Sequence, residues 1–374
     1  MIAGVIAEFN PFHNGHKYLL QEAKKGADGL AVVMSPNVCQ RGEFSLYNKF
    51  IRAEAAVRCG ADLVVEMPSI SAAAAAEDFA RVGVKILTCL GMEKLVFGSE
   101  GGNKEALFRA LENLEKAEKS GELKEKLKSG ESYPKVLGSV LGEAFNDAPN
   151  DILALEYIKN LNSIPFETVK RVGVSHNSNK AEMGFASGSY IRKNGIDKGL
   201  IPSEAYDLFI KEKPFDYETS EVLELSYLKR LTAAEIALAP GVSEGIQNRI
   251  YEALKEANSL EEALELIKTK RYSLARIRRI LFSLYLGFKK EDDKEPKYIR
   301  ILAFNDKGKE IIKAAKKTSP LPIITSLSEA LKISEEAKVS AEREGFITDI
   351  YNFNSGIRAG EDFRFSPKPV NISK

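Results

Sequence analysis

Two of the three histidines in this chain stand three residues apart in the segment EFNPFHNGHKYLL, residues 8–20. An apolar run, IAGVIA, precedes them and a helical pattern follows, so His13 and His16 lie in a turn from a strand to a helix. The N-terminus of a helix presents free N–H groups and a partial positive charge, both of which suit phosphate. Two imidazoles there can donate hydrogen bonds to phosphoryl oxygens and stabilise the charge that builds up as pyrophosphate leaves. The spacing therefore indicates phosphate chemistry at this turn.

The pair also has two structural interpretations. Either histidine could be a packed, hydrogen-bonded residue, and a spacing of three permits metal ligation. No third or fourth ligand accompanies the pair, and Cys39, Cys59 and Cys89 are far apart and form no CxxC. Neither interpretation accounts for Gly15, which would let a ligand approach the backbone, or for the strand before the turn. We therefore expect no metal ligands from the protein and no disulfide framework.

The elements that must position this turn alternate along the first part of the chain. Valine-rich apolar runs predict strands, and helical spacing between them predicts helices at 15–26, 48–60 and 76–91. The predicted strands are 2–7, 29–35, 62–68, 94–99 and 166–176. This alternation predicts an α/β fold with a parallel sheet, helices on both faces and right-handed crossovers. Ligands of such sheets bind beyond the carboxyl ends of the strands, where the HNGH turn lies.

Three regions follow from changes of pattern along the chain. Residues 1–199 carry the strand–helix alternation, with a charged helical excursion at 103–130. Residues 200–292 are helical almost throughout, and residues 293–374 contain a strand at 297–304, then a helix and another strand. We expect an α/β domain, a helical region and a small C-terminal α/β unit.

The composition, 44% hydrophobic and 29% charged over 374 residues, is that of a soluble globular protein. No apolar run approaches the roughly 20 residues of a membrane span, and no signal peptide is recognisable, so we expect a cytoplasmic protein. A net charge of +1 neither favours nor excludes a nucleic acid partner. The charge is uneven, however, because residues 268–290 hold eight Lys or Arg and no acidic residue.

A second motif, SGSYIR at 187–192, places Ser187, Ser189 and Arg192 at the start of a predicted helix. Together with HNGH it resembles the signatures of the HxGH nucleotidyltransferase superfamily, whose relatives include class I aminoacyl-tRNA synthetases. Those enzymes attack the α-phosphate of a nucleoside triphosphate and expel pyrophosphate. A Walker A loop, the competing ATP signature, is absent because GSEGGNKE does not have its spacing.

Further motifs narrow the resemblance to one branch. Glu8 and Asn10 depart from the GTFDPxHxGH opening of small-molecule adenylyltransferases. The segments EFNPFHNGH, VMSPNVCQRGEFSLYNKF, VFGSE, PNDILALEYIK, RVGVSH, ASGSYIR, RYSLARIRRIL and YIRILAFNDKGKEI resemble the bacterial tRNA(Met) cytidine acetate ligase family, over nearly the whole chain. The resemblance implies a Rossmann-like, HIGH-type nucleotidyltransferase domain. It also implies that ATP activates acetate as acetyl-adenylate, and that the acetyl group passes to N4 of the wobble cytidine of elongator tRNA(Met), with release of AMP and diphosphate.

The resemblance assigns roles by motif. It implies that His13, His16 and Arg192 are catalytic, with Mg²⁺ bridging the ATP phosphates. The implied ATP-binding residues are Ala7, Glu8, Phe9, Asn10, Pro11, Phe12, His13, Asn14, Gly15, His16, Leu19, Gly98, Asn150, Arg171, Val172, Ser187, Ser189 and Arg192. A side chain at Gly98 would crowd a nucleotide, Asn150 can donate and accept, and Arg171 can fork onto phosphate. Without the resemblance, these three fit a tight turn, a helix N-cap and a surface cation equally well.

The basic stretch at residues 268–290 is interpreted as an RNA contact. The expected tRNA-binding residues are Arg41, Lys49, Arg271, Arg276, Arg278 and Arg279, and the interleaved Tyr272 and Tyr285 could stack on a base. The alternative is a solvated helix face, with the apolar residues of IRRILFSLYLGF packed in a core on the other side. The role of His176, just after the fifth strand, stays open.

Two other functions remain possible from the sequence. One is a small-molecule adenylyltransferase acting on a phosphorylated cofactor precursor, which would share the ATP site. The other is an RNA-binding scaffold with a degenerate site, which the intact HNGH and SGSYIR argue against. The expected partners are tRNA and acetate, and no protein partner is indicated.

Overall fold

The computed structural model describes the chain except residues 129–132, 143–144, 146–147, 173–180, 244 and 372–374. Seven strands form one sheet in the order β7-β6-β1-β2-β5-β8-β9. The first five of these strands pair in parallel, which confirms the predicted α/β sheet. They are β1 (Ile2–Ala7), β2 (Gly29–Met34), β5 (Leu63–Glu66), β6 (Lys94–Ser99) and β7 (Phe166–Lys170). All five occur where the apolar runs predicted strands.

The strand order places the HNGH turn. Strands β2 and β5, which follow β1 in the sequence, lie on one side of β1 in the sheet, and the later strands β6 and β7 lie on its other side. The order therefore reverses beside β1, and the carboxyl ends of β1 and β6 leave a crevice there. The turn with both histidines leaves the sheet at this point.

The C-terminal strands join the main sheet. β8 (Ile299–Phe304) pairs antiparallel with β5, and β9 (Ile323–Ile324) pairs with β8. The two strands within residues 293–371 therefore extend the main sheet. The sequence shows an apolar strand at this place but not its partner, and the partner is the open edge of β5.

A short hairpin follows β2 and was not predicted. It comprises β3 (Val38–Cys39) and β4 (Glu43–Phe44), whose two-residue strands are too short to leave a periodic pattern. Gly42 in its turn has φ +77°, and a Cβ there would lie 2.8 Å from the backbone nitrogen of Arg279. The glycine therefore lets the hairpin pack closely against the helix that contains Arg279.

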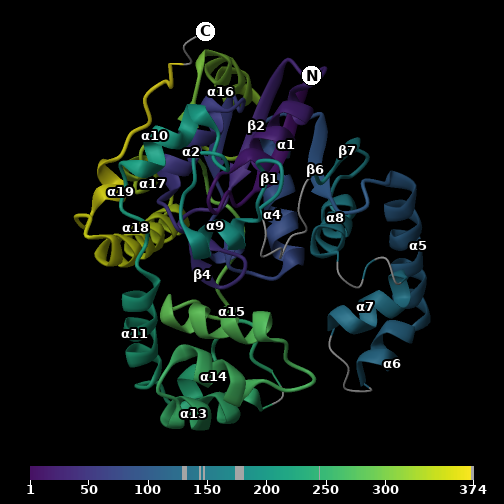
Figure 1. Ribbon diagram of the computed structural model, residues 1–374, viewed down its shortest axis with the longest axis vertical. Helices are drawn as coiled ribbons and strands as arrows, with labels where there is room; N and C mark the ends of the chain where they lie inside the picture. Colours follow the sequence, from purple (N-terminus) through teal and green to yellow (C-terminus); the bar gives the residue numbers. More distant parts are fainter. Residues whose placement is uncertain (129–132, 143–144, 146–147, 173–180, 244, 372–374) are drawn as a thin grey trace.

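Helices cover both faces of the sheet, as Figure 1 shows. Val5 and Val32 face a core shared with α1 (Asn14–Lys24) and α2 (Lys49–Arg58). Ile6 and Val33, one residue further along each strand, face the opposite core with α4 (Ala76–Cys89). Strands β1, β2, β5 and β6 are buried on both sides, which explains their nearly continuous apolar runs.

The remaining helices form three groups around this framework (Figure 1). Helix α8 (Pro149–Lys159) packs beside β6, α5 (Lys104–Ser120) packs against α8, and α6 (Glu122–Lys128) and α7 (Tyr133–Leu141) pack against α5, while α3 (Ser69–Ala72) follows β5 (Figure 1). The stretch after β7 has α9 (Gly188–Asn194), α10 (Ser203–Ile210), α11 (Tyr217–Leu228), α12 (Ala233–Ile236), α13 (Ile246–Glu256), α14 (Leu260–Ile267) and α15 (Leu274–Tyr285). Last come α16 (Asp306–Thr318), α17 (Leu327–Ala330), α18 (Glu335–Ser355) and α19 (Glu361–Arg364). Helices α11 to α15 pack around a core of their own. In the part of the chain that the structure describes, no helix has the length and apolarity to span a membrane.

Candidate active site

The two histidines cap the helix that they begin. His13 is the N-cap of α1, and its Nδ1 accepts from the backbone N–H of Gly15 (3.1 Å). In return, Nδ1 of His16 accepts from the backbone N–H of His13 (3.3 Å), and the two rings stack with centroids 3.8 Å apart. A neutral imidazole that accepts at Nδ1 carries its proton on Nε2. The local structure therefore makes Nε2 of each histidine a hydrogen-bond donor.

Neighbouring residues hold this pair in place. A Cβ at Gly15 would lie 2.9 Å from Cε1 of His13, so the glycine makes room for the ring. Phe9, fully buried, contacts the His16 ring edge-on at a centroid distance of 4.9 Å. Phe9 has φ +51°, an uncommon backbone conformation for a bulky residue. The histidines thus have the packed, structural role that the sequence allowed, and they also line a cavity.

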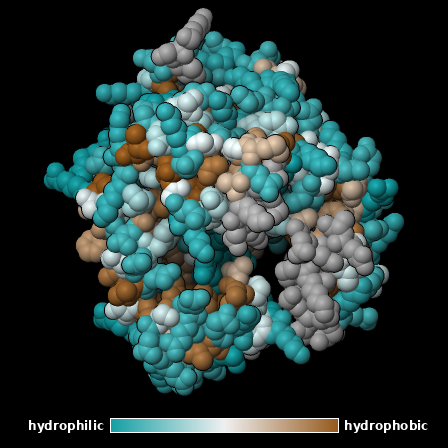
Figure 2. Space-filling view, in the orientation of Figure 1, coloured by the Kyte–Doolittle hydropathy of each residue, from teal (hydrophilic) through white to brown (hydrophobic). Residues whose placement is uncertain are grey.

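The cavity has a volume of about 720 Å³, which lies in the range of small-molecule sites. It opens between the carboxyl ends of the strands and helices α14 and α15, where Figure 2 shows the surface hollowed. Most predicted ATP-binding residues line it: Ala7, Glu8, Phe9, Asn10, His13, Gly15, His16, Leu19, Gly98, Asn150, Arg171, Val172, Ser189 and Arg192. The structure therefore brings together residues that lie up to 185 positions apart in the chain.

Four predicted ATP-binding residues shape the site without lining it. Phe12 is fully buried, and Pro11 follows Asn10 through a cis peptide bond. Asn14 donates from Nδ2 to the carbonyls of Gly184 (2.8 Å) and Gly199 (2.9 Å). Ser187 is the N-cap of α9 and accepts from the Tyr190 N–H. These residues fix the turn after β1 and its contact with the second motif.

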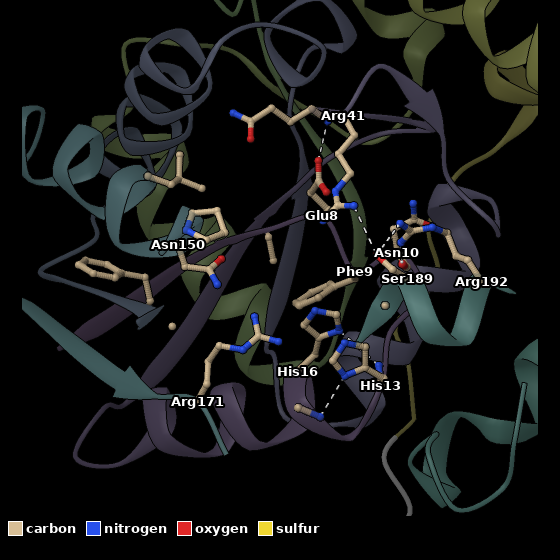
Figure 3. A pocket seen from close by; sticks show the side chains of 18 of the residues that line it. Glu8, Phe9, Asn10, His13, His16, Arg41, Asn150, Arg171, Ser189 and Arg192 are labelled. Carbon is tan, nitrogen blue, oxygen red and sulfur yellow. Dashed lines mark hydrogen bonds between the residues drawn. The ribbon is translucent and has the colours of Figure 1, made fainter. Parts of the chain in front are cut away.

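One wall of the cavity is cationic (Figure 3). Arg192 donates from Nη1 to the carbonyl of Asn10 (2.8 Å) and from Nη2 to Oγ of Ser189 (3.3 Å). Arg41, from the hairpin turn, donates to the same hydroxyl (3.4 Å). Gly188 permits this approach because a Cβ there would lie 2.9 Å from the Asn10 carbonyl oxygen. Two guanidinium groups from separate motifs therefore converge beside the HNGH turn.

A carboxylate, Glu8, lies beside these cations. Its Oε1 accepts from the backbone N–H of Gln40 (2.6 Å). Burial raises the pKa of Glu8, and Glu43 raises it further, while the Gln40 hydrogen bond, Arg41 and Arg192 lower it. The net direction is upward, so this carboxylate binds a proton more readily than an exposed one.

The opposite wall combines an open strand end with a polar loop. A Cβ built at Gly98 would meet no atom within 4 Å, so a side chain there would project into the cavity. Asn150 donates from Nδ2 to Oε1 of Glu100 (2.7 Å) and is not the N-cap of α8, which is Ala148. Burial lowers the pKa of Arg171, and Glu100 counteracts that effect. Glu100 was not predicted as a site residue, because no motif spacing in the sequence identifies it.

The predicted RNA contacts separate into two groups. Arg41, Arg278 and Arg279 line the cavity, whereas Arg271 does not line it and is exposed in the segment before α15. Arg276 donates to the carbonyl of Gly241 (2.9 Å) and covers the ring of Tyr272. Two of the three arginines of α15, Arg278 and Arg279, therefore line the cavity, whereas Arg276 packs within the helical region.

Two of the expected RNA contacts are wrong. Lys49 is fully buried, where its Nζ pairs with Glu66 (2.5 Å) and Asp362 (2.8 Å), so it cannot reach RNA. Tyr272 is buried in the core of the helical region and bonds to the Ser243 carbonyl (2.7 Å), so it cannot stack on a base. The apolar side of α15 packs in the same core, as the alternative interpretation of this stretch allowed. His176 lies outside the described residues.

A parallel sheet with an HNGH turn at its switch point, faced by an arginine at a second helix start, defines a nucleotidyltransferase of the HIGH type. In agreement, a family model described as HIGH Nucleotidyl Transferase matches residues 1–359. Relatives of similar sequence identify the family within this class. Proteins named tRNA(Met) cytidine acetate ligase are 39% identical in Thermoanaerobacter sp. and 33% identical in Staphylococcus saprophyticus, over 97% and 96% of this chain and 98% and 97% of their own lengths. The chain belongs to the tRNA(Met) cytidine acetate ligase family, as its motifs implied.

Solved structures agree with this placement. The crystal structure of Thermotoga maritima TmcAL bound with alpha-thio ATP has a TM-score of 0.88 and 31% identity, with 99% of each chain covered. The apo form of that protein has a TM-score of 0.86 and 30% identity. These values confirm the Rossmann-like nucleotidyltransferase fold for this chain.

Proposed function

We propose that this protein uses ATP to activate acetate and then acetylates N4 of the wobble cytidine of elongator tRNA(Met). The observation that supports this most strongly is the convergence of His13, His16 and Arg192 on one cavity, in a chain that matches tRNA(Met) cytidine acetate ligases over nearly its full length. The proposed products are N4-acetylcytidine, AMP and diphosphate.

The first step is the formation of acetyl-adenylate. A carboxylate oxygen of acetate attacks the α-phosphorus of ATP in line, the new O–P bond forms, and the bond to the β-phosphate breaks. The Nε2–H donors of His13 and His16, together with the N-terminus of α1, stabilise the charge on the departing pyrophosphate. Arg192 holds the phosphates from the other side. Positioning and charge stabilisation suffice, so no side chain acts as a nucleophile.

The adenosine half of ATP lies against the wall of Gly98 and Asn150 in this proposal. Gly98 leaves space where a side chain would intrude, and the Asn150 amide can bond to ribose or base. Arg171 and Val172, which directly follow β7, close that wall.

Mg²⁺ is proposed to enter with the triphosphate. Among the residues that the structure describes, no three His, Cys, Asp or Glu side chains gather to hold a metal ion. Phosphate oxygens are hard ligands of the kind that Mg²⁺ prefers, and the ion would neutralise part of their charge.

The tRNA is proposed to lie across the cavity mouth. Arg271, Arg276, Arg278 and Arg279, with Arg41 from the hairpin, would contact its phosphates. The target cytidine must leave its stack to reach the acetyl-adenylate, which costs a few kcal/mol. We place this reaction in the cytoplasm, where the tRNA substrate is used.

The test is mass analysis of tRNA nucleosides after incubation of the protein with ATP and isotope-labelled acetate. We expect labelled N4-acetylcytidine in elongator tRNA(Met), together with AMP. Unmodified tRNA, or a dinucleotide-like product formed from a small phosphorylated acceptor, would contradict the proposal and favour an adenylyltransferase.

A further inference from the structure

The second step of the proposed reaction needs a proton acceptor. The N4 lone pair of cytidine attacks the acetyl carbonyl carbon, a C–N bond forms, and the C–O bond to the AMP phosphate breaks. The attacking amine becomes positively charged as it bonds and must lose one proton to give the neutral amide. A base positioned next to the acetyl group accelerates such a step.

The histidines do not fit this role. Nδ1 of both His13 and His16 accepts a backbone N–H, so Nε2 carries the proton and donates. The carboxylates of Glu261 and Glu265 also line the cavity, but they are exposed on α14, which faces the carboxyl ends of the strands from across the cavity. Glu43 does not line the cavity, and its two oxygens lie 3.4 Å from Arg192 and 3.7 Å from Arg278.

Glu8 has the geometry of an oriented base. It stands directly after the last residue of β1, beside the HNGH turn, and lines the cavity (Figure 3). Oε1 is fixed by the Gln40 N–H at 2.6 Å, whereas Oε2 has no hydrogen-bond partner among the described residues. Its backbone is held as well, because Nη1 of the buried Arg52 donates to the Glu8 carbonyl (2.5 Å). One oxygen is therefore anchored and the other is available to a ligand.

We propose that Glu8 is the general base that takes the N4 proton of cytidine during acetyl transfer. This inference rests on the proposed function, since it assumes acetyl-adenylate in the cavity. A carboxylate would repel a triphosphate, so it is poorly suited to hold phosphate, but it is well suited to the side of the acetyl group from which the neutral amine approaches. The Glu8 carboxylic acid then returns its proton to solvent when the acetylated tRNA leaves.

The groups around Glu8 adjust its proton affinity. The hairpin contributes Arg41, Glu43 and Cys39, α9 contributes Arg192, and α8 contributes Tyr157. Burial raises the pKa of Glu8, and the two arginines limit the rise. In its ionised form, a carboxylate with a raised pKa is a stronger base than an exposed one.

The experiment separates the two half-reactions. Acetate-dependent exchange of pyrophosphate into ATP reports the first step. Single-turnover transfer from chemically prepared acetyl-adenylate to elongator tRNA(Met) reports the second. The variant is Glu8→Gln, whose amide oxygen can still accept from Gln40 but cannot take a proton, and Glu8→Asp restores the carboxylate.

We expect Glu8→Gln to slow transfer by roughly 100-fold or more, the usual contribution of a general base, and to slow exchange far less. Transfer by the unmodified protein should increase as the pH rises through the Glu8 pKa, and Glu8→Gln should lose this dependence. Glu8→Asp should regain it at a lower rate. The control Glu261→Gln, which removes an exposed carboxylate at the cavity rim, should slow transfer less than threefold.

Three results would overturn the inference. In the first, Glu8→Gln transfers at the original rate with the original pH profile, so that the proton leaves by way of AMP or water. In the second, Glu8→Gln slows exchange and transfer equally, which assigns Glu8 to structure or to the first step. In the third, Glu261→Gln has the larger effect. Failure of the proposed function has a different signature, because the unmodified protein would then show no acetate-dependent exchange.

Discussion

Replacing Gly98 by valine should weaken ATP binding without lowering the stability of the fold. Gly98 lies in β6 opposite Val169 of β7, its φ is not in the left-handed region, and an added Cβ meets nothing within 4 Å. The folded chain can therefore accept the side chain, and the loss of glycine flexibility in the unfolded chain stabilises the protein by about 0.4–1 kcal/mol. The same methyl groups project into the cavity, where the adenosine half of ATP is proposed to lie.

The magnitude follows from the cost of overpacking. Extra methyl groups in a filled site cost about 1–3 kcal/mol, which corresponds to a roughly 5- to 150-fold weaker affinity for ATP. The assay is an ATP titration by calorimetry, combined with thermal unfolding of the ligand-free protein. We expect an unchanged or higher Tm together with the loss of affinity.

A matched glycine provides the control. Gly4 lies in β1, and a Cβ there would collide with the sulfur of Met92 and approach Cδ1 of Leu87 at 2.8 Å. Gly4→Ala should therefore lower the Tm but leave ATP affinity nearly intact at low temperature. If Gly98→Val binds ATP as tightly as the original protein, the nucleotide does not lie against β6. If it unfolds at a markedly lower temperature, the space at Gly98 is not open.

Three other changes test separate parts of the structure. Lys49→Met should lower the free energy of unfolding by about 3–5 kcal/mol, because Glu66 and Asp362 lose a buried partner. Chemical denaturation measures this change, and a loss of stability under about 1 kcal/mol would contradict the prediction. The pKa of Asp362 is lowered to about 2, because the charges of Lys49 and Arg300 outweigh the effect of burial. Asp362 should therefore stabilise the fold above pH 4, and this contribution should be lost as the pH falls toward 2. Asp362→Asn should remove this pH dependence from the unfolding curves, and an identical pH dependence in the variant would contradict the prediction. Replacing Arg278 and Arg279 together by glutamine should reduce the slope of log affinity against log salt for tRNA by about 1.4, whereas a slope equal to that of the original protein would exclude both from phosphate contact.

Much of the candidate site could be predicted because it is local. The strand before HNGH, the helix after it and the glycine between the histidines are neighbours in sequence, so their geometry depends on few residues. The second motif could be linked to the first only through the family resemblance. The contact that joins them, from Arg192 to the Asn10 carbonyl, spans 182 positions and leaves no trace in the spacing.

The errors arise where distant residues decide the outcome. Lys49 follows the hairpin and could face either solvent or core, and the decision depends on Asp362, 313 positions away. The direction of Tyr272 likewise depends on Ser243, which belongs to the loop before α13. The strand Ile299–Phe304 was recognised by its apolar run, but only the open edge of β5 makes it part of the main sheet. Local patterns identify elements, whereas their partners require tertiary structure.

Acetate-dependent exchange of labelled pyrophosphate into ATP tests most directly whether the HNGH turn activates the α-phosphate. The decisive comparison is with His16→Asn, because the asparagine oxygen can still accept the His13 backbone N–H while the Nε2–H donor is lost. We predict exchange by the unmodified protein only when acetate is present, and a roughly 100- to 1,000-fold lower rate in the variant. Equal exchange rates in the two proteins, or exchange that does not require acetate, would contradict the account.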